Sequence, residues 1–230
     1  MDRRLEGKAV LVSGASGGLG ETVTRALLAE GAGVAGVARS WSRLPEGDFL
    51  PLSADLTQEG AAETLVRQTL EQFGRLDAAI HLMGGFVGGS KVQETRLEDW
   101  DRMMILNLRS AFLFFRAALP PMLEKKRGRL IAVGSRTGAS PAAGMSAYGV
   151  SKAGLHALVQ TLAAENQRTG ITANAVLPGI IATPANRAAM PEADASRWVA
   201  PASIAELIVW LASDASADVS GALIPIYGRS

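Results

Sequence analysis

Tyr148 and Lys152 are the two residues whose types and spacing could carry proton transfer. They stand four positions apart in a segment with helical spacing, so we expect them on one face of a helix, one turn apart. A free phenol has a pKa near 10, and a neighbouring ammonium favours the phenolate and lowers that pKa. A pKa lowered by about three units would correspond to roughly 4 kcal/mol and would make Tyr148 a general acid/base near neutral pH. The alternative is a solvated helix face without chemistry.

Two further polar residues could join this pair. Ser135 ends an apolar strand pattern thirteen residues before Tyr148. Strand ends of this kind converge on the ligand crevice of a doubly wound sheet, where Ser135 could hydrogen-bond a substrate oxygen. Asn107 interrupts an otherwise apolar helix pattern. A buried Asn would need hydrogen-bond partners, whereas a surface Asn would need none, and the sequence leaves both readings open.

A glycine-rich segment, 13–20, follows the first predicted strand and opens a helix. Gly14 permits a tight turn, Gly18 lets the backbone approach a pyrophosphate, and Gly20 lets the helix pack close to the sheet. Backbone N–H groups at the start of the helix would then bind the anion. The spacing Gly14-x-x-x-Gly18-x-Gly20 departs from G-x-G-x-x-G, so a glycine-rich turn without a ligand is the alternative.

Arg39 occupies the place where an NAD-binding unit carries an acid for the ribose 2′-hydroxyl, about 20 residues beyond the turn. A guanidinium there can pair with a 2′-phosphate in a fork geometry. The sequence therefore favours NADP(H) over NAD(H), with a solvated Arg39 as the alternative.

A hydrolase is the competing enzyme class. The run 14–18 also satisfies the G-x-S-x-G nucleophile pattern around Ser16, and Asp77 or Asp101 with His156 could complete a triad. His156, however, falls inside a helix pattern, whereas a triad His usually lies on a loop. A hydrolase is therefore the less favoured reading.

The elements that must position these residues alternate between short apolar runs and longer helical patterns. Strands are predicted at 9–12, 34–37, 49–52, 78–82, 130–133, 173–177 and 223–226, and helices at about 20–30, 61–73, 95–121, 147–167 and 203–211. Capping boxes at 95–98 and 203–206 are expected to open two of the helices, and Pro120-Pro121 to end the longest. Continuously apolar strands suit a parallel sheet buried on both faces. We predict a single-domain, Rossmann-like, doubly wound α/β fold of seven strands with helices on both faces, and a short substrate lid at about 184–200.

Composition narrows the function classes. The 23 basic and 22 acidic residues give a net charge of +1, which argues against a nucleic-acid partner. The absence of Cys excludes disulfides and thiolate chemistry, and two His residues make a His-rich metal site improbable. The most apolar stretch, 103–115, is interrupted by Asn107 and Arg109 and is predicted not to span a membrane. With no apolar signal core at its start, the chain is expected to be cytoplasmic.

Taken in order, these motifs resemble those of the short-chain dehydrogenase/reductase family over essentially the whole chain. The matching pieces are the Gly14-x-x-x-Gly18-x-Gly20 turn, Asp55-Leu56, Asn107, Ser135, Tyr148-x-x-x-Lys152 and the run Asn174-Ala175-Val176-Leu177-Pro178-Gly179. The resemblance implies hydride transfer between a nicotinamide cofactor and a small carbonyl or alcohol substrate. It also implies a homodimer or homotetramer formed by the helices around Trp100–Leu119 and after Tyr148.

The resemblance assigns a role to each catalytic residue. Tyr148 would be the proton donor and Ser135 would position the carbonyl. Lys152 would bind the nicotinamide ribose and lower the pKa of Tyr148, and Asn107 would support a water-linked proton relay to Lys152. Asp55 would contact adenine and Thr183 the nicotinamide end. The full set of implied cofactor contacts is Gly14, Ser16, Gly17, Gly18, Leu19, Gly20, Arg39, Asp55, Leu56, Gly84, Gly85, Tyr148, Lys152, Pro178, Gly179, Ile181 and Thr183.

The chain departs from the family pattern after the fourth strand. The family commonly has Asn-Asn-Ala-Gly there, whereas this chain has His81-Leu82-Met83-Gly84, followed by Gly85. The glycines preserve a close backbone approach, but the Asn contributions to the support of the strand are lost.

Two segments, 84–89 and 183–194, resemble quinoid dihydropteridine reductases more narrowly. That subgroup usually lacks the catalytic Ser and prefers NADH, whereas this chain has Ser135 and Arg39. Pteridine reduction is therefore an alternative to an ordinary carbonyl substrate, and a dinucleotide-sensing module without turnover is a remote one. Phe86, Met145 and Trp198 could line an apolar pocket or pack in the core.

Overall fold

The fold, described by a computed structural model for residues 3–41 and 43–229, is built on one parallel sheet of seven strands. The strands are β1 (Ala9–Ser13), β2 (Gly33–Val37), β3 (Phe49–Leu52), β4 (Ala78–His81), β5 (Gly128–Val133), β6 (Ile171–Pro178) and β7 (Leu223–Ile226). Their order across the sheet is β3-β2-β1-β4-β5-β6-β7. Residues of β1, β2, β4, β5 and β6 are buried throughout, which confirms the parallel sheet inferred from continuous apolar runs.

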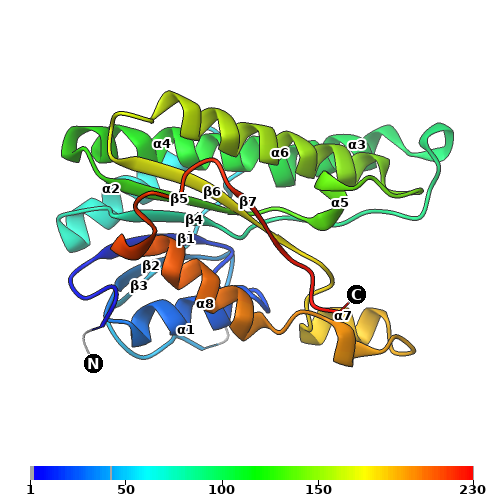
Figure 1. Ribbon diagram of the computed structural model, residues 1–230, viewed down its shortest axis with the longest axis horizontal. Coiled ribbons are helices and arrows are strands. Elements are labelled where there is room, and N and C mark those ends of the chain that lie inside the picture. The colour runs from blue at the N-terminus through cyan, green and yellow to red at the C-terminus, as the bar shows by residue number, and fades with distance from the viewer. Residues whose placement is uncertain (1–2, 42, 230) are drawn as a thin grey trace.

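Helices cover both faces of this sheet, as a doubly wound fold requires (Figure 1). The helical segments are α1 (Gly20–Ala29), α2 (Ala61–Phe73), η1 (Val92–Glu94), α3 (Leu97–Met103), η2 (Met104–Arg109), α4 (Ser110–Lys125), α5 (Arg136–Ala139), α6 (Ser146–Glu165), α7 (Pro184–Ala189), η3 (Ala195–Arg197), α8 (Pro201–Ala212) and η4 (Asp214–Ser216). Figure 1 shows α1 and α8 below the sheet and α2, α4 and α6 above it. The two apolar cores lie between the sheet and these layers.

The strand order reverses beside β1, because β2 lies on one side of it and β4 on the other. Open α/β sheets bind ligands at such a reversal, outside the carboxyl ends of the strands. The segments that follow β1, β4, β5 and β6 therefore meet at one edge, and each of the four carries predicted site residues.

Neither predicted capping box forms. The residue before α3 is Arg96, without a side-chain cap, and the Thr95 hydroxyl instead donates to Lys91 O at 3.0 Å and lies 3.0 Å from Ser146 Oγ. The helix α8 begins two residues before the second box, at Pro201. Proline suits this first position because its missing N–H would have no partner there.

The prediction that Pro120-Pro121 ends the long helix is wrong, because α4 continues to Lys125 and ends where Lys126 takes a φ of +50°. The fixed φ of proline is compatible with a helix, and buried Met122 holds the following turn against the core.

The segment 184–200, predicted as a short substrate lid, contains α7 and η3. The Thr183 side chain accepts a hydrogen bond from Asn186 N and so caps α7.

The continuous helical stretch Leu97–Lys125 is long and apolar enough to cross a membrane by length and composition alone. Half of its most apolar window is buried inside the protein, where α4 packs on the sheet and on α2. A core helix of a soluble protein has these same properties.

Candidate active site

Ser135 and Tyr148 meet above the end of β5. Ser135 directly follows Gly134 at the end of this strand, and its hydroxyl accepts a hydrogen bond from Thr137 N at 3.2 Å, which caps α5. Tyr148 lies in the first turn of α6, and its hydroxyl hydrogen-bonds the Ser135 side chain. The helix thus presents a phenol to the residue at the strand end, as the sequence predicts.

The electrostatics of Tyr148 differ from the expectation. Burial raises the pKa of the phenol above 10, and the hydrogen bond with Ser135 offsets only part of this effect. Lys152 does not contribute to this pKa, and its Nζ donates to Val133 O at 2.9 Å. Burying a phenolate is unfavourable, so the protein alone keeps the proton on Tyr148.

Lys152 belongs to the buried face of α6. Burial lowers the pKa of its ammonium to about 8 from the usual 10.5. At neutral pH the group is still mostly protonated, so it places a positive charge one helical turn from Tyr148. A Cβ at Gly84 would lie 3.4 Å from Lys152 Nζ and 2.8 Å from Asn107 Oδ1, so all three residues meet at one point.

Asn107 is fully buried inside the π-helical segment η2. Its Oδ1 accepts from Gly85 N at 2.8 Å, and its Nδ2 donates to Gly85 O at 3.1 Å and to Ser151 Oγ at 3.0 Å. The surface alternative for Asn107 is thereby ruled out. A widened turn of this kind often occurs at a functional site, and here it joins the loop after β4 to the helix that carries Tyr148.

The glycine-rich turn has the geometry that a phosphate-binding turn requires. Gly14 has a φ of +69°, and a Cβ there would lie 3.0 Å from Met83 N. A Cβ at Gly20 would collide with Gly14 O, which explains the close contact of α1 with the turn. The residue before α1, Leu19, supplies no side-chain cap, so the N–H of Gly20 is available to an anion, whereas Glu21 N donates to Gly17 O at 2.9 Å. The residues present therefore fit a dinucleotide.

Arg39 and Asp55 lie at the far end of this crevice, after β2 and β3. Both are exposed, and the Asp55 carboxylate accepts hydrogen bonds from Thr57 N and Thr57 Oγ1 at 3.0 and 2.7 Å. These bonds, with a smaller contribution from Arg39, hold the pKa of Asp55 below its usual value. Leu56 is buried in the core, so only its backbone could contact a cofactor.

The segment after β6 reaches back to the glycine-rich turn. Gly179 N donates to Ile226 O at 3.1 Å after Pro178, and Ile181 forms an isolated bridge with Val199. These contacts bring Thr183 against Gly18, where a Cβ would lie 3.1 Å from Thr183 Cβ. Thr183 therefore lies over the turn, as its predicted role requires.

The chain matches the family model described as short chain dehydrogenase over residues 8–194. It belongs to the short-chain dehydrogenase/reductase family. Its members use a nicotinamide cofactor, and the chain is an oxidoreductase for a carbonyl or alcohol substrate. The Rossmann-like fold is confirmed with it.

Relatives span nearly the whole chain. A 3-oxoacyl-[acyl-carrier-protein] reductase from Vibrio cholerae is 31% identical over 238 residues, covering 97% of each chain. A (3R)-3-hydroxyacyl-CoA dehydrogenase from Rattus norvegicus is 32% identical, covering 98% of this chain and 96% of its own. Among solved structures, a short-chain dehydrogenase/reductase from Serratia marcescens aligns with a TM-score of 0.87 and 30% identity over 98% of both chains. These matches give no support to the narrower resemblance to dihydropteridine reductases.

At its departure from the family pattern, this short-chain dehydrogenase/reductase has a buried imidazole. His81 Nδ1 lies 2.9 Å from Ser13 Oγ, and His81 Nε2 lies 3.2 Å from Ser110 Oγ. Since the Ser110 hydroxyl donates to Leu106 O at 2.7 Å, His81 Nε2 must carry the proton that Ser110 Oγ accepts. Burial and the charge of Lys152 lower the pKa of His81 to about 3, so the ring stays neutral.

The expected loss of support at the fourth strand is therefore compensated. Ser13 Oγ donates to His81 Nδ1 and accepts from Leu82 N and Met83 N at 3.2 and 3.3 Å. His81 thus ties the glycine-rich turn to the loop after β4 and, through Ser110, to η2. Pattern reasoning did not predict this role, because the contacts come from strands far apart in the sequence.

The positions of Asp77 and His156 contradict the hydrolase alternative. Asp77 is paired with Arg75 at the opposite, amino-terminal end of the sheet, at 2.6 Å. His156 lies on the buried face of α6 and accepts a hydrogen bond from Ser135 N. Neither is placed to activate Ser16 in the glycine-rich turn.

The three apolar residues that could line a substrate pocket, Phe86, Met145 and Trp198, lie in two different places. Phe86 is 62% exposed and packs edge-on against Tyr148, with ring centroids 5.0 Å apart. A Cβ at Gly88 would contact both Phe86 and Met145, so these two residues lie together beside the catalytic pair. Trp198, in contrast, is buried and belongs to the packing of the protein.

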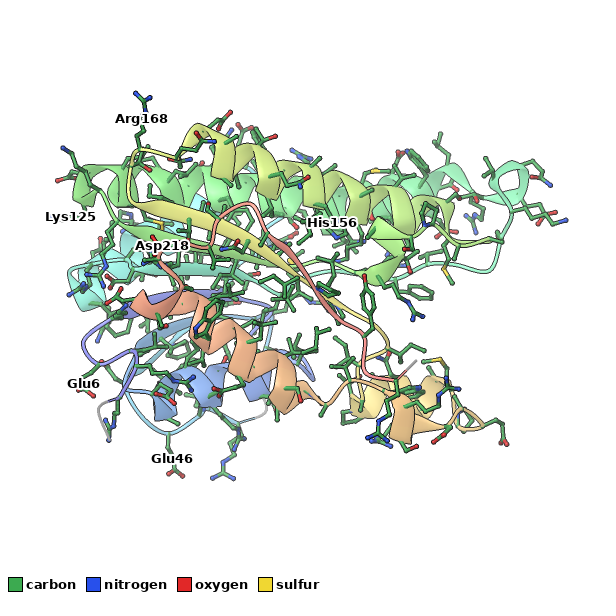
Figure 2. All side chains as sticks on the ribbon, viewed as in Figure 1. Glu6, Glu46, Lys125, His156, Arg168 and Asp218 are labelled. Carbon is green, nitrogen blue, oxygen red and sulfur yellow. The ribbon has the colours of Figure 1, made fainter. Side chains whose placement is uncertain are left out.

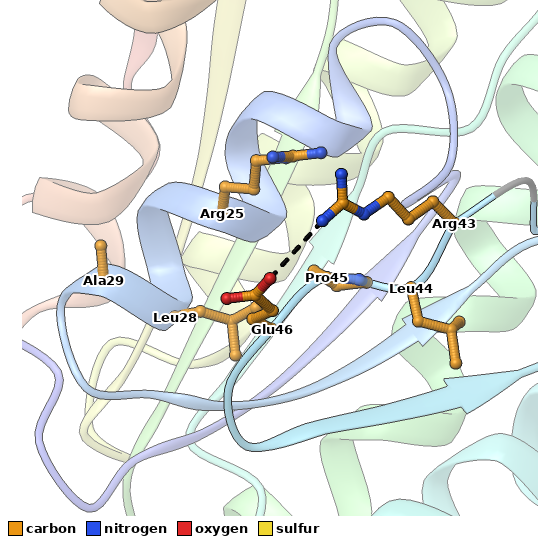
Figure 3. Close-up of a pocket in the computed structure, with 7 residues that line it drawn as sticks. All are labelled: Arg25, Leu28, Ala29, Arg43, Leu44, Pro45 and Glu46. Carbon is orange, nitrogen blue, oxygen red and sulfur yellow. Dashed lines mark hydrogen bonds and ion pairs between the residues drawn. The ribbon is translucent and has the colours of Figure 1, made fainter.

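A separate groove of about 320 Å³ lies outside this crevice, between α1 and the connection 38–48 (Figure 3). The described residues of that connection form no helix. In Figure 3 the guanidinium groups of Arg25 and Arg43 face each other, and Arg43 bonds Glu46 at 3.5 Å. No predicted site residue lines this groove.

Proposed function

We propose that the chain is an NADPH-dependent carbonyl reductase in which Tyr148 is the general acid. The observation that carries the proposal is the hydrogen-bonded pair of Ser135 and Tyr148, with the buried ammonium of Lys152 one turn away. A bound nicotinamide supplies the hydride. Ser135 positions the substrate carbonyl, and Tyr148 gives its proton to the carbonyl oxygen, where negative charge develops.

The remaining polar residues support that step. Lys152 is proposed to contribute its charge at the cofactor, since in the protein alone it does not lower the pKa of Tyr148. Lys152 is also proposed to hold the nicotinamide ribose, for which its ammonium has two donors beyond the bond to Val133 O. Asn107, through the backbone of Gly85 and the side chain of Ser151, fixes the surroundings of Lys152 for a water-linked proton relay. The residues of the glycine-rich turn and the segment 178–183 hold the dinucleotide.

The proposal is tested by following NADPH oxidation with acetoacetyl-CoA and with ethyl acetoacetate. The first is a 3-oxoacyl thioester, the class named for two relatives. Turnover of either compound supports the proposal. Tight NADPH binding without turnover of these or other simple carbonyls would instead favour a dinucleotide-sensing module.

The preference for NADPH depends on Arg39. Its guanidinium follows β2, is exposed and forms no salt bridge with any residue that the structure describes, so it is available to a 2′-phosphate. Arg39→Ala is expected to weaken NADPH binding about 10- to 100-fold and leave NADH binding unchanged, since a hydrogen bond to a charged group contributes about 1.5–3 kcal/mol.

Paired fluorescence titrations with the two cofactors measure this effect. Arg67→Ala, an exposed change on α2, is the matched control. Equal binding of NADPH and NADH by the unchanged protein would contradict the preference. A loss seen in Arg43→Ala rather than Arg39→Ala would assign the phosphate to the neighbouring arginine.

Pteridine reduction is the second candidate, and the exposed ring of Phe86 against Tyr148 favours it. A planar bicyclic substrate could stack on this ring while its reacting atom faces the phenol. Ser135 and Arg39 favour the ordinary carbonyl instead. Quinonoid dihydropterin tested beside acetoacetyl-CoA decides between them by the larger kcat/KM.

We further propose a homodimer or homotetramer assembled through α4 and α6. A groove of about 380 Å³ on this side is lined by Met104, Ile105, Leu108, Arg109, Phe112 and Leu158. Phe112 is 46% exposed, which is unusual for so large an apolar side chain unless a partner covers it. We expect this enzyme to be located in the cytoplasm.

Phe112→Glu is expected to convert the oligomer to monomer, because an unpaired buried carboxylate costs several kcal/mol. Light scattering coupled to size exclusion measures the mass. Leu44→Glu, on the connection after β2, changes an equally exposed apolar residue and should leave the mass unchanged. A wild-type protein that elutes as a monomer would contradict the proposed assembly.

A further inference from the structure

His156 occupies a notch beneath the catalytic serine. It projects from α6 toward the sheet and is 4% exposed (Figure 2). Gly134 and Gly138 flank Ser135 on either side in the sequence, and both face the imidazole. A Cβ at Gly134 would collide with His156 Nε2, and a Cβ at Gly138 would lie 2.7 Å from His156 Cε1. Each glycine therefore makes room for the ring.

The ring makes one directional contact with the catalytic residue. Ser135 N donates to His156 Nε2 at 3.3 Å. Because Nε2 accepts, the proton of the neutral ring must lie on Nδ1. Burial and the charge of Lys152 lower the pKa of His156 to about 4, so the ring remains an acceptor at neutral pH.

This contact completes the restraint of Ser135. The Ser135 hydroxyl accepts from Thr137 N at 3.2 Å and bonds Tyr148, while its backbone N–H is held by His156. A buried N–H without a partner costs about 1–3 kcal/mol, enough to favour a different placement of the residue. Without the imidazole, Ser135 would keep its contacts with Thr137 N, Gly138 N and Tyr148, but its backbone N–H would lose its partner.

We propose that His156 is a positioning residue that holds Ser135 at the distance from Tyr148 needed for proton transfer, seated in a notch formed by Gly134 and Gly138. The inference rests on the proposed carbonyl reduction and adds to it a residue outside the Ser–Tyr–Lys set. It acts through Ser135 and contacts neither substrate nor cofactor.

Four variants test this role. His156→Leu fills the space without an acceptor, and His156→Gln keeps an acceptor. Gly134→Ala keeps the imidazole but forces it away from Ser135 N, and the double variant His156→Leu/Gly134→Ala combines the two changes. The readouts are kcat and KM for acetoacetyl-CoA, the Kd of NADPH, the melting temperature and the exchange rate of the Ser135 amide.

His156→Leu and Gly134→Ala are each expected to lower kcat about 10- to 100-fold, as misplacement of a catalytic group does. NADPH binding should stay unchanged, because the notch lies away from the dinucleotide turn. His156→Gln should recover most of the lost turnover. The double variant should lose no more than either single one, since both changes break the same contact.

Val159→Ala, at another buried position of α6, controls for lost packing and should leave kcat unchanged. Full kcat in folded His156→Leu would overturn the inference, as would losses in kcat that follow the melting temperature and are not recovered by Gln.

Failure of the proposed function is distinguishable, because the wild type would then turn over no carbonyl. In that case amide exchange decides: faster exchange of Ser135 in His156→Leu supports the positioning contact, and equal exchange refutes it.

Discussion

Replacing Tyr148 with Phe is expected to lower turnover of a carbonyl substrate by about 10²- to 10⁴-fold, the usual contribution of a general acid. The phenol is the acidic group hydrogen-bonded to Ser135, and its raised pKa keeps the proton available for donation at neutral pH. Phe retains the ring that packs against Phe86, so only the hydroxyl is lost. The effect should appear in kcat, while the Kd of NADPH stays within error of the wild type.

Tyr227→Phe is the matched control, because it removes the other tyrosine hydroxyl of the chain and should leave kcat unchanged. A Tyr148→Phe protein with unchanged turnover would reject the general-acid role. A protein that loses NADPH binding as well would show that the hydroxyl contributes to the cofactor site rather than to the chemical step alone.

The parallel sheet could be predicted because its signal is local. Strands such as β1 and β2 are buried on both faces, and the sequence shows this directly as continuous apolar runs. The Tyr148–Lys152 spacing likewise needs only the pitch of a helix. Turn and cap details could not be predicted equally well: Thr95 found partners at Lys91 and Ser146 that no capping pattern contains.

The site residues that were missed depend on contacts between distant elements. His81 bonds Ser13 and Ser110, which lie 68 and 29 positions away, and His156 bonds Ser135 across 21 positions. A polar residue within an apolar run was the available signal for both. The wrong sign for the pKa of Tyr148 has a related cause, since burial depends on the whole fold and not on the neighbouring charge alone.

Lys152→Met is expected to abolish turnover without unfolding the protein. The difference between the usual pKa of 10.5 and the value of about 8 in the fold corresponds to a penalty of about 3 kcal/mol for keeping the ammonium charged at neutral pH. Met removes that penalty and fills similar space, but it also removes the hydrogen bond to Val133 O, which contributes about 1.5–3 kcal/mol. The two effects nearly cancel, so stability at pH 7 should change little.

The pH dependence of stability separates these effects. The folded-state pKa of Lys152 lies below the unfolded value, so between pH 8 and 10.5 the unfolded chain binds more protons at this site. Wild-type stability therefore contains a contribution that rises with pH across this window, by about 3 kcal/mol in full, and Lys152→Met should lack it. Urea unfolding of both proteins at several pH values measures the difference. Parallel curves would show that Lys152 is not held charged in a buried site, and the role proposed for its buried ammonium at the nicotinamide ribose would then fail.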